Sequence, residues 1–91
     1  MIKHYNISVK GKVQGVFYRA TTKEKARELG LKGFVKNMAD GSVYLEAQGE
    51  PAALEQLVEW CNKGPKKAVV EEVSKEEGPL KNFDGFEVMY F

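Results

Sequence analysis

An Asp-Gly pair at residues 40 and 41 separates two short runs of strand-forming residues, and this pattern restricts the folds open to the chain. The runs cover residues 33–37 and 42–47. Asp-Gly favours the tight turn of a β-hairpin, because glycine adopts positive φ angles without steric cost. We therefore expect the two runs to pair as antiparallel strands, and we expect the role of Gly41 to be structural.

The segments before this hairpin indicate a strand and then a helix. Residues 5–10 alternate between apolar and polar side chains, which is the period of a half-buried strand. Good helix formers fill residues 20–29, and Gly30 follows where a helix can end in a left-handed turn. The chain is therefore predicted to enter the hairpin from a helix.

The segments after the hairpin indicate a second helix and two more strands. The helix is predicted to begin at Pro51 and to be closed by Gly64-Pro65. Residues 68–73 indicate a fourth strand, and its glutamates favour a place near a sheet edge. Residues 76–82 are predicted to form an exposed loop and residues 86–90 a closing strand.

The order of these elements is β-α-β-β-α-β with a short extra strand, which matches the ferredoxin-like split β-α-β architecture. The predicted fold class is therefore α+β, an antiparallel sheet of four to five strands with two helices on one face. We expect residues 1–91 to form a single domain. Because this architecture carries many unrelated activities, function must be predicted from particular residues.

Charge and composition exclude several classes of protein. The chain has 14 Lys and Arg residues against 13 Asp and Glu, and this net charge of +1 is too balanced for a protein that mainly binds nucleic acid. The start lacks the apolar run of a signal peptide, and no stretch of about eighteen apolar residues follows, so we expect a cytoplasmic protein with no membrane partner. We expect a monomer. We also expect the single cysteine, Cys61, to pack in the core, Trp60 to have a structural packing role beside the apolar stripe of its helix, and His4 to lie on the surface.

Residues 11–19, Gly-Lys-Val-Gln-Gly-Val-Phe-Tyr-Arg, connect the first strand to the first helix and place an arginine at the start of that helix. Exposed backbone N–H groups in such a turn, together with the positive end of the helix, favour a phosphate or a carboxylate. Arg19 can donate two parallel hydrogen bonds to the same anion. Gly15 would let the backbone approach the anion closely. The segment therefore predicts an anion-binding site.

Two separated motifs resemble the paired signature of the acylphosphatase family. They are Gly11-x-Val13-Gln14-Gly15-Val16-x-Tyr18-Arg19 and Gly33-Phe34-Val35-Lys36-Asn37-x-x-x-Gly41-x-Val43. Gly64-Pro65, Ala68 and Phe86 also stand where that family commonly has such residues, so the resemblance covers essentially the whole chain. Two departures are Lys66, where a second proline is common, and Tyr18, where phenylalanine is frequent.

The resemblance implies hydrolysis of the carboxyl-phosphate bond of acyl phosphates by direct attack of water, with no metal, cofactor or covalent intermediate. By the same resemblance, Arg19 binds the phosphate and Asn37 orients the attacking water. The backbone N–H groups that would complete the phosphate site belong to Gln14, Gly15, Val16, Phe17 and Tyr18. Inorganic phosphate, the product, is expected to compete with the small-molecule substrate. A neutral amide suits the role of Asn37, since it donates and accepts at once and does not repel an anion.

Several alternatives are weighed against this function. A cysteine-dependent phosphatase would need a thiolate six residues before the arginine, where this chain has Val13. An RNA-binding module of the same fold would carry its basic-Gly-aromatic motif on the third strand, whereas residues 32–35 precede the hairpin turn. A non-catalytic phosphate-binding regulatory domain, or a domain that handles carbamoyl phosphate in a larger protein, would use the same site. Since the chain ends with this domain, we expect a free-standing enzyme.

Overall fold

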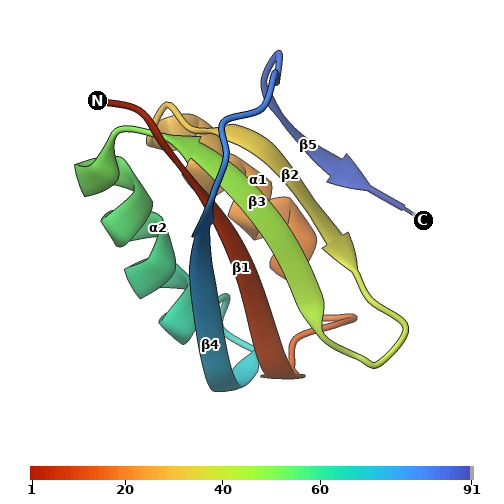
Figure 1. The fold of residues 1–91 in the computed structure, drawn as a ribbon. Helices are drawn as coiled ribbons and strands as arrows, with labels where there is room; N and C mark the ends of the chain where they lie inside the picture. The colour runs from red at the N-terminus through yellow and green to blue at the C-terminus, as the bar shows by residue number, and fades with distance from the viewer. Residues whose placement is uncertain (91) are drawn as a thin grey trace.

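The computed structural model describes residues 1–90, which form five strands and two helices (Figure 1). The predicted order of elements is confirmed. The elements are β1 (Lys3–Lys12), α1 (Tyr18–Glu28), β2 (Lys32–Asn37), β3 (Val43–Gly49), α2 (Pro51–Lys63), β4 (Val69–Gly78) and β5 (Phe86–Met89). None of the described helices is both long enough and apolar enough to cross a membrane.

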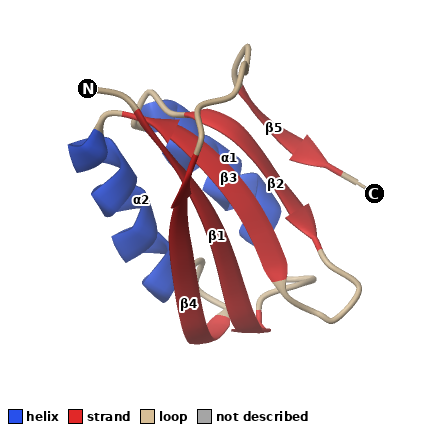
Figure 2. Cartoon of the chain, viewed as in Figure 1, coloured by secondary structure: helices blue, strands red, loops and turns tan. Residues whose placement is uncertain are grey.

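The strands form one sheet in the order β4-β1-β3-β2-β5, and both helices cover the same face of it (Figure 2). This arrangement is the predicted ferredoxin-like α+β fold. The sheet is mixed rather than antiparallel, because β5 pairs with β2 in the parallel direction, with Gly33 opposite Phe86. β4 ends beside the start of β1, and β2 begins at this same end of the sheet. The chain therefore enters β5 from that end, so β5 runs in the same direction as β2.

Alternating side chains of the inner strands build the core between the sheet and the helices. Ile7 and Val9 of β1 and Leu45 of β3 are fully buried on this face. The stripe of α2 that meets them contains Leu54, Leu57 and Cys61, all fully buried. Burial raises the pKa of the Cys61 thiol to about 12, so this cysteine packs as an apolar side chain, as predicted.

Two predicted boundaries are wrong. Strand β4 continues to Gly78, so residues 76–78 lie in a strand and not in the predicted loop. They remain in the sheet because β1 supplies a pairing partner as far as His4, while the glutamate side chains of this edge strand stay exposed. Helix α1 begins at Tyr18, two residues before the predicted start, so the turn that precedes it is short.

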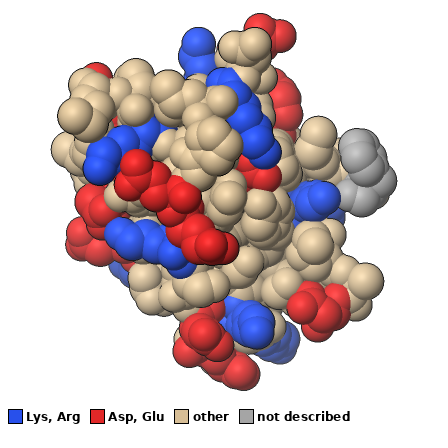
Figure 3. Space-filling view, viewed as in Figure 1, with Lys and Arg blue, Asp and Glu red and all other residues tan. Residues whose placement is uncertain are grey.

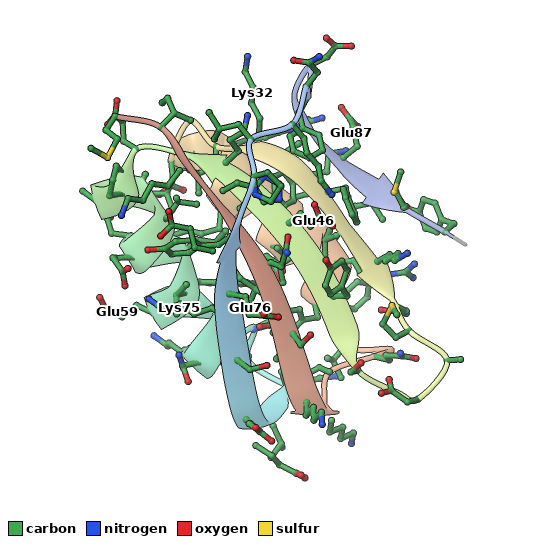
Figure 4. The ribbon with its side chains drawn as sticks, in the orientation of Figure 1. Lys32, Glu46, Glu59, Lys75, Glu76 and Glu87 are labelled. Atoms are coloured by element: carbon green, nitrogen blue, oxygen red, sulfur yellow. The ribbon has the colours of Figure 1, made fainter. Side chains whose placement is uncertain are left out.

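The other face of the sheet carries a buried polar cluster instead of the predicted exposed His4. His4 is fully buried, because the segment that follows β4 crosses this face and places the ring of Phe83 in a stack 5.7 Å from the imidazole. Its Nε2 lies 2.9 Å from Oε1 of Glu46, a residue of β3 that is labelled in Figure 4. The prediction failed because a single histidine on a strand does not reveal which distant segment will cover it.

In the view of Figure 3, which includes the edge where β4 lies beside α2, acidic and basic side chains are interspersed over the surface. Lys75, for example, lies 3.0 Å from Glu55 of α2, and Lys3 lies 3.6 Å from Glu77 of the same strand as Lys75. The mixture agrees with the net charge of +1 and gives this face no broad field of one sign.

Candidate active site

A cavity of about 330 Å³ lies between the start of α1 and the ends of β2 and β5. The described residues that line it include one cation, Arg19, one amide, Asn37, and no acidic side chain. The described residues of the lining are Val13, Gly15, Phe17, Tyr18, Arg19, Ala20, Asn37, Val88 and Tyr90. A cavity with this lining favours an anion over a cation.

The loop before α1 has two residues in left-handed backbone conformations. Gly15 has φ 74°, and Phe17 has φ 63° and ψ 21°. Phe17 is the one described residue other than glycine with a positive φ, a conformation that costs an L-residue roughly 1 to 2 kcal/mol. Left-handed residues in a tight turn direct successive N–H groups toward a common point and create a concave anion site. The strain at Phe17 therefore coincides with a backbone shape suited to phosphate.

The start of α1 leaves its first backbone N–H groups without a side-chain cap. The N-cap residue is Phe17, whose side chain makes no capping hydrogen bond. The first turn also contains no acidic residue. The first N–H groups of a helix have no partner within the helix, and the helix dipole adds partial positive charge there. This helix end is therefore equipped to bind an anion.

Tyr18 fixes the position of this helix end. Its hydroxyl donates a 2.7 Å hydrogen bond to the carbonyl of Cys61 in α2, and its ring packs 5.4 Å from Trp60. Burial holds the pKa of the Tyr18 hydroxyl far above its usual range, so the hydroxyl remains a donor. The predicted phosphate loop is thereby anchored to the second helix as well as to the sheet.

Arg19 follows on the next residue of α1 and lines the cavity. Its guanidinium carbon lies 4.8 Å from the centroid of the Tyr90 ring, so the planar cation rests on an aromatic face. This contact restricts the rotamers of a long side chain beside the cavity.

Asn37 is the last residue of β2 and lines the same cavity. Its Oδ1 is buried and has no hydrogen-bond partner among residues 1–90. Leaving a buried acceptor without a partner costs about 1 to 3 kcal/mol, and few such groups occur in native proteins. The unpaired acceptor therefore belongs to a residue of the cavity wall and has no partner in the described protein.

The structure brings together most of the residues predicted for the site. Arg19 and Asn37 line one cavity with three members of the predicted phosphate loop, Gly15, Phe17 and Tyr18. The other two members do not line it. Val16 is buried in the core, and the side chain of Gln14 points to the β2–β3 turn.

Sequence reasoning missed Tyr90 and Val88, which line the cavity from the end of the chain. The parallel pairing of β5 with β2 brings them there, and no local pattern in residues 86–90 indicates it. Among residues 1–90, no group of three or more His, Cys, Asp or Glu is arranged to hold a metal ion.

Comparisons with known proteins agree on one family. The acylphosphatase family model matches residues 5–88. A curated acylphosphatase of Marinobacter nauticus is 55% identical over 78 residues, which cover 86% of this chain and 85% of the relative.

Solved structures give the same result. The structure of an acylphosphatase from Coxiella burnetii superposes with a TM-score of 0.94 at 41% identity, over 97% of this chain and 93% of that one. The crystal structure of acylphosphatase from Bacillus subtilis has the same TM-score at 35% identity, over 99% of this chain and 100% of that one.

Proposed function

This chain belongs to the acylphosphatase family, and we propose that it hydrolyses the carboxyl-phosphate bond of acyl phosphates by direct attack of water, with no metal ion. The observation that carries the proposal is the meeting of Arg19 and Asn37 at one cavity beside an uncapped helix start. The products are a carboxylate and inorganic phosphate.

Arg19 and the loop backbone would hold the phosphoryl group. The guanidinium donates two hydrogen bonds to phosphate oxygens, and the N–H groups of residues 14–18 surround the remaining oxygens. Phosphoryl transfer depends mainly on alignment and on stabilising charge at the equatorial oxygens. Alignment contributes up to roughly 7 to 11 kcal/mol, and one donor aimed at developing charge about 2.7 to 4 kcal/mol. These contributions suffice for a bond whose leaving group is a resonance-stabilised carboxylate.

Asn37 would orient the attacking water. The unpaired Oδ1 would accept a hydrogen bond from one O–H of the water. This hydrogen bond would turn a lone pair of the water oxygen toward phosphorus. The water oxygen bonds to phosphorus while the bond from phosphorus to the acyl oxygen breaks, and the electron pair leaves with the carboxylate. The proton of the water passes to a phosphate oxygen, so the cavity, which has no acidic or histidine side chain in its described lining, needs no general base.

The same arrangement disfavours the alternatives. Val13 lines the cavity where a cysteine-dependent phosphatase would place its nucleophile, and its side chain has no nucleophilic atom. An RNA-binding module would present unobstructed aromatic rings on the open sheet face, whereas Phe34 is half-buried and the Phe83 ring makes an edge contact with it, 6.2 Å between centroids.

The proposal includes the remaining properties expected for such an enzyme. Inorganic phosphate competes with substrate, because it occupies the same loop as the transferred group. The enzyme acts as a monomer in the cytoplasm, on small acyl phosphates. A non-catalytic phosphate-binding domain would bind phosphate equally well and would differ only in lacking turnover.

Turnover of an aryl carboxyl-phosphate tests the proposal. Purified protein is incubated with this anhydride in the presence of a chelator, and the matched aryl phosphate monoester serves as the control substrate. We expect rapid loss of the anhydride, no loss of the monoester, and competitive inhibition by inorganic phosphate. Activity abolished by the chelator would overturn the metal-free mechanism, and binding of phosphate without turnover would favour the regulatory domain.

A further inference from the structure

The side chain of Gln14 connects the two halves of the site. Its Nε2 donates one hydrogen bond to the carbonyl of Met38 at 2.8 Å and a second to the carbonyl of Ser42 at 2.9 Å. Both amide hydrogens are therefore used by the β2–β3 turn. Gln14 is the first residue of the phosphate loop, and Met38 directly follows Asn37. The contact thus spans 24 residues of sequence and joins the phosphate loop to the residue next to Asn37.

The turn that receives these hydrogen bonds is itself rigid. The N–H of Met38 donates to the carbonyl of Ser42 at 2.8 Å, and the N–H of Gly41 donates to the carbonyl of Met38 at 3.2 Å. One carboxylate oxygen of Asp40 accepts from both the N–H and the hydroxyl of Ser42, at 3.0 and 2.6 Å. These hydrogen bonds to Ser42 lower the pKa of Asp40, so the carboxylate remains an acceptor at neutral pH. Asn37 is therefore followed directly by a turn that several internal hydrogen bonds close.

The side-chain oxygen of Asn37, Oδ1, accepts no hydrogen bond from the described residues. The position of this oxygen therefore depends on the backbone that carries the side chain. That backbone is paired with β3 through Asn37 and Val43. On the side of the phosphate loop, the described hydrogen bonds that join it to residues 38–42 are the two from Gln14. The distance between the bound phosphoryl group and the attacking water would depend on this link.

We infer that Gln14, through its side chain, is a positioning residue that holds Asn37 at the correct distance from the phosphate loop. The inference rests on the proposed function, and it assigns to Gln14 a role separate from its backbone N–H. It predicts that loss of the side-chain donors reduces the chemical step and leaves phosphate binding intact. A displacement of about 1 Å in a reacting group can lower a rate by as much as roughly a hundredfold.

Kinetics of Gln14→Met, Gln14→Glu and Gln14→Ala test the inference. Methionine keeps the length of the side chain without donors, and glutamate keeps the shape but places oxygen atoms against the two carbonyls. All three variants retain the backbone N–H. The matched control is Gln56→Glu, at an exposed glutamine on α2 outside the cavity. For each variant we would measure kcat, the inhibition constant of inorganic phosphate and the unfolding midpoint, using an aryl carboxyl-phosphate as substrate.

We expect kcat to fall roughly tenfold to a hundredfold in all three Gln14 variants, as for a misaligned water, with the phosphate inhibition constant unchanged within about twofold. In an Asn37→Ala background, Gln14→Met should lower kcat further by less than about twofold, because the two residues act on the same step. Equal losses in kcat and phosphate affinity, or full additivity with Asn37→Ala, would overturn the inference. If the wild-type protein hydrolyses no acyl phosphate, the proposed function fails. That result is distinguishable from failure of the Gln14 inference, which is measured on an active wild-type protein.

Discussion

The guanidinium of Arg19 rests on the ring of Tyr90, with 4.8 Å between the guanidinium carbon and the ring centroid. The two residues are far apart in sequence and meet because β5 pairs in parallel with β2. The aromatic face supports the cation without neutralising it, so the full charge remains available to an anion in the cavity. An ion pair with a carboxylate in this position would compete with the phosphate.

This contact predicts a modest role for Tyr90 in phosphate binding. A cation–π contact at an exposed site contributes about 0.5 to 1 kcal/mol, so Tyr90→Leu should raise KM and the phosphate inhibition constant about two- to fivefold. Tyr90→Phe, which keeps the ring, is the control and should behave as wild type. A comparable loss in Tyr90→Phe would show that the hydroxyl, and not the aromatic face, supports Arg19.

The anchor of the phosphate loop predicts a loss of stability in Tyr18→Phe. The substitution removes the donor to the Cys61 carbonyl in a buried environment and should lower the free energy of unfolding by about 1 to 3 kcal/mol. Urea denaturation measures this change. Tyr90→Phe also removes a tyrosine hydroxyl, but from an exposed side chain, so it should cost less. An equal or smaller loss in Tyr18→Phe would mean that the hydroxyl bond to α2 is not an important anchor.

The buried carboxylate on the open sheet face predicts an acid-sensitive contribution to stability. Burial opposes the charge of Glu46, but hydrogen bonds from Lys81, Tyr44 and His4 outweigh it and hold the pKa of Glu46 below its usual value. A carboxylate with a lowered pKa in the folded state stabilises fully above the unfolded pKa, about 4.3 for glutamate. This stabilisation is lost as the pH falls through the folded pKa.

Glu46→Gln should therefore cost about 1 to 3 kcal/mol at pH 7, because it removes the charge that accepts hydrogen bonds from Lys81 and Tyr44. The difference from wild type should shrink below about pH 4, where the wild-type carboxylate becomes protonated. Glu76→Gln, at an exposed position on the same face, is the control. A difference that persists unchanged at low pH would mean that the charge of Glu46 does not stabilise the fold.

Direct attack of water at phosphorus predicts where solvent oxygen is incorporated. Hydrolysis in water enriched in ¹⁸O should place the label in inorganic phosphate and none in the carboxylate, since the bond that breaks joins phosphorus to the acyl oxygen. Mass spectrometry of both products measures the label. Label in the carboxylate would indicate attack at the carbonyl carbon and would contradict the roles of Arg19 and Asn37.

Local patterns were sufficient to predict most of the fold and to single out the candidate site residues. Asp40-Gly41 indicated the hairpin, and Gly41 has φ 94°, as such a turn requires. Pro51 and Gly64 marked the ends of α2, where Gly64 caps the helix with φ 68°. The two motifs identified Arg19 and Asn37, which the structure places at one cavity.

Contacts between distant segments could not be predicted. His4 is buried because residues near Phe83 return over the sheet, and Tyr90 reaches Arg19 because β5 joins the sheet beside β2. The link from Gln14 to the turn at 38–42 is of the same kind. In each case the local sequence specifies a strand, a turn or a polar residue, and only the packed chain determines its neighbour.

The kcat/KM of Arg19→Ala and Asn37→Ala on an aryl carboxyl-phosphate, with chelator present, tests the proposed site most directly. Each substitution should lower kcat/KM by roughly a hundredfold or more, as expected for loss of a group that acts on the transition state. Arg27→Ala on the same helix and Asn62→Ala on α2 remove the same side-chain types outside the cavity and should retain activity when folded. Unchanged kcat/KM in Arg19→Ala would contradict the proposed site.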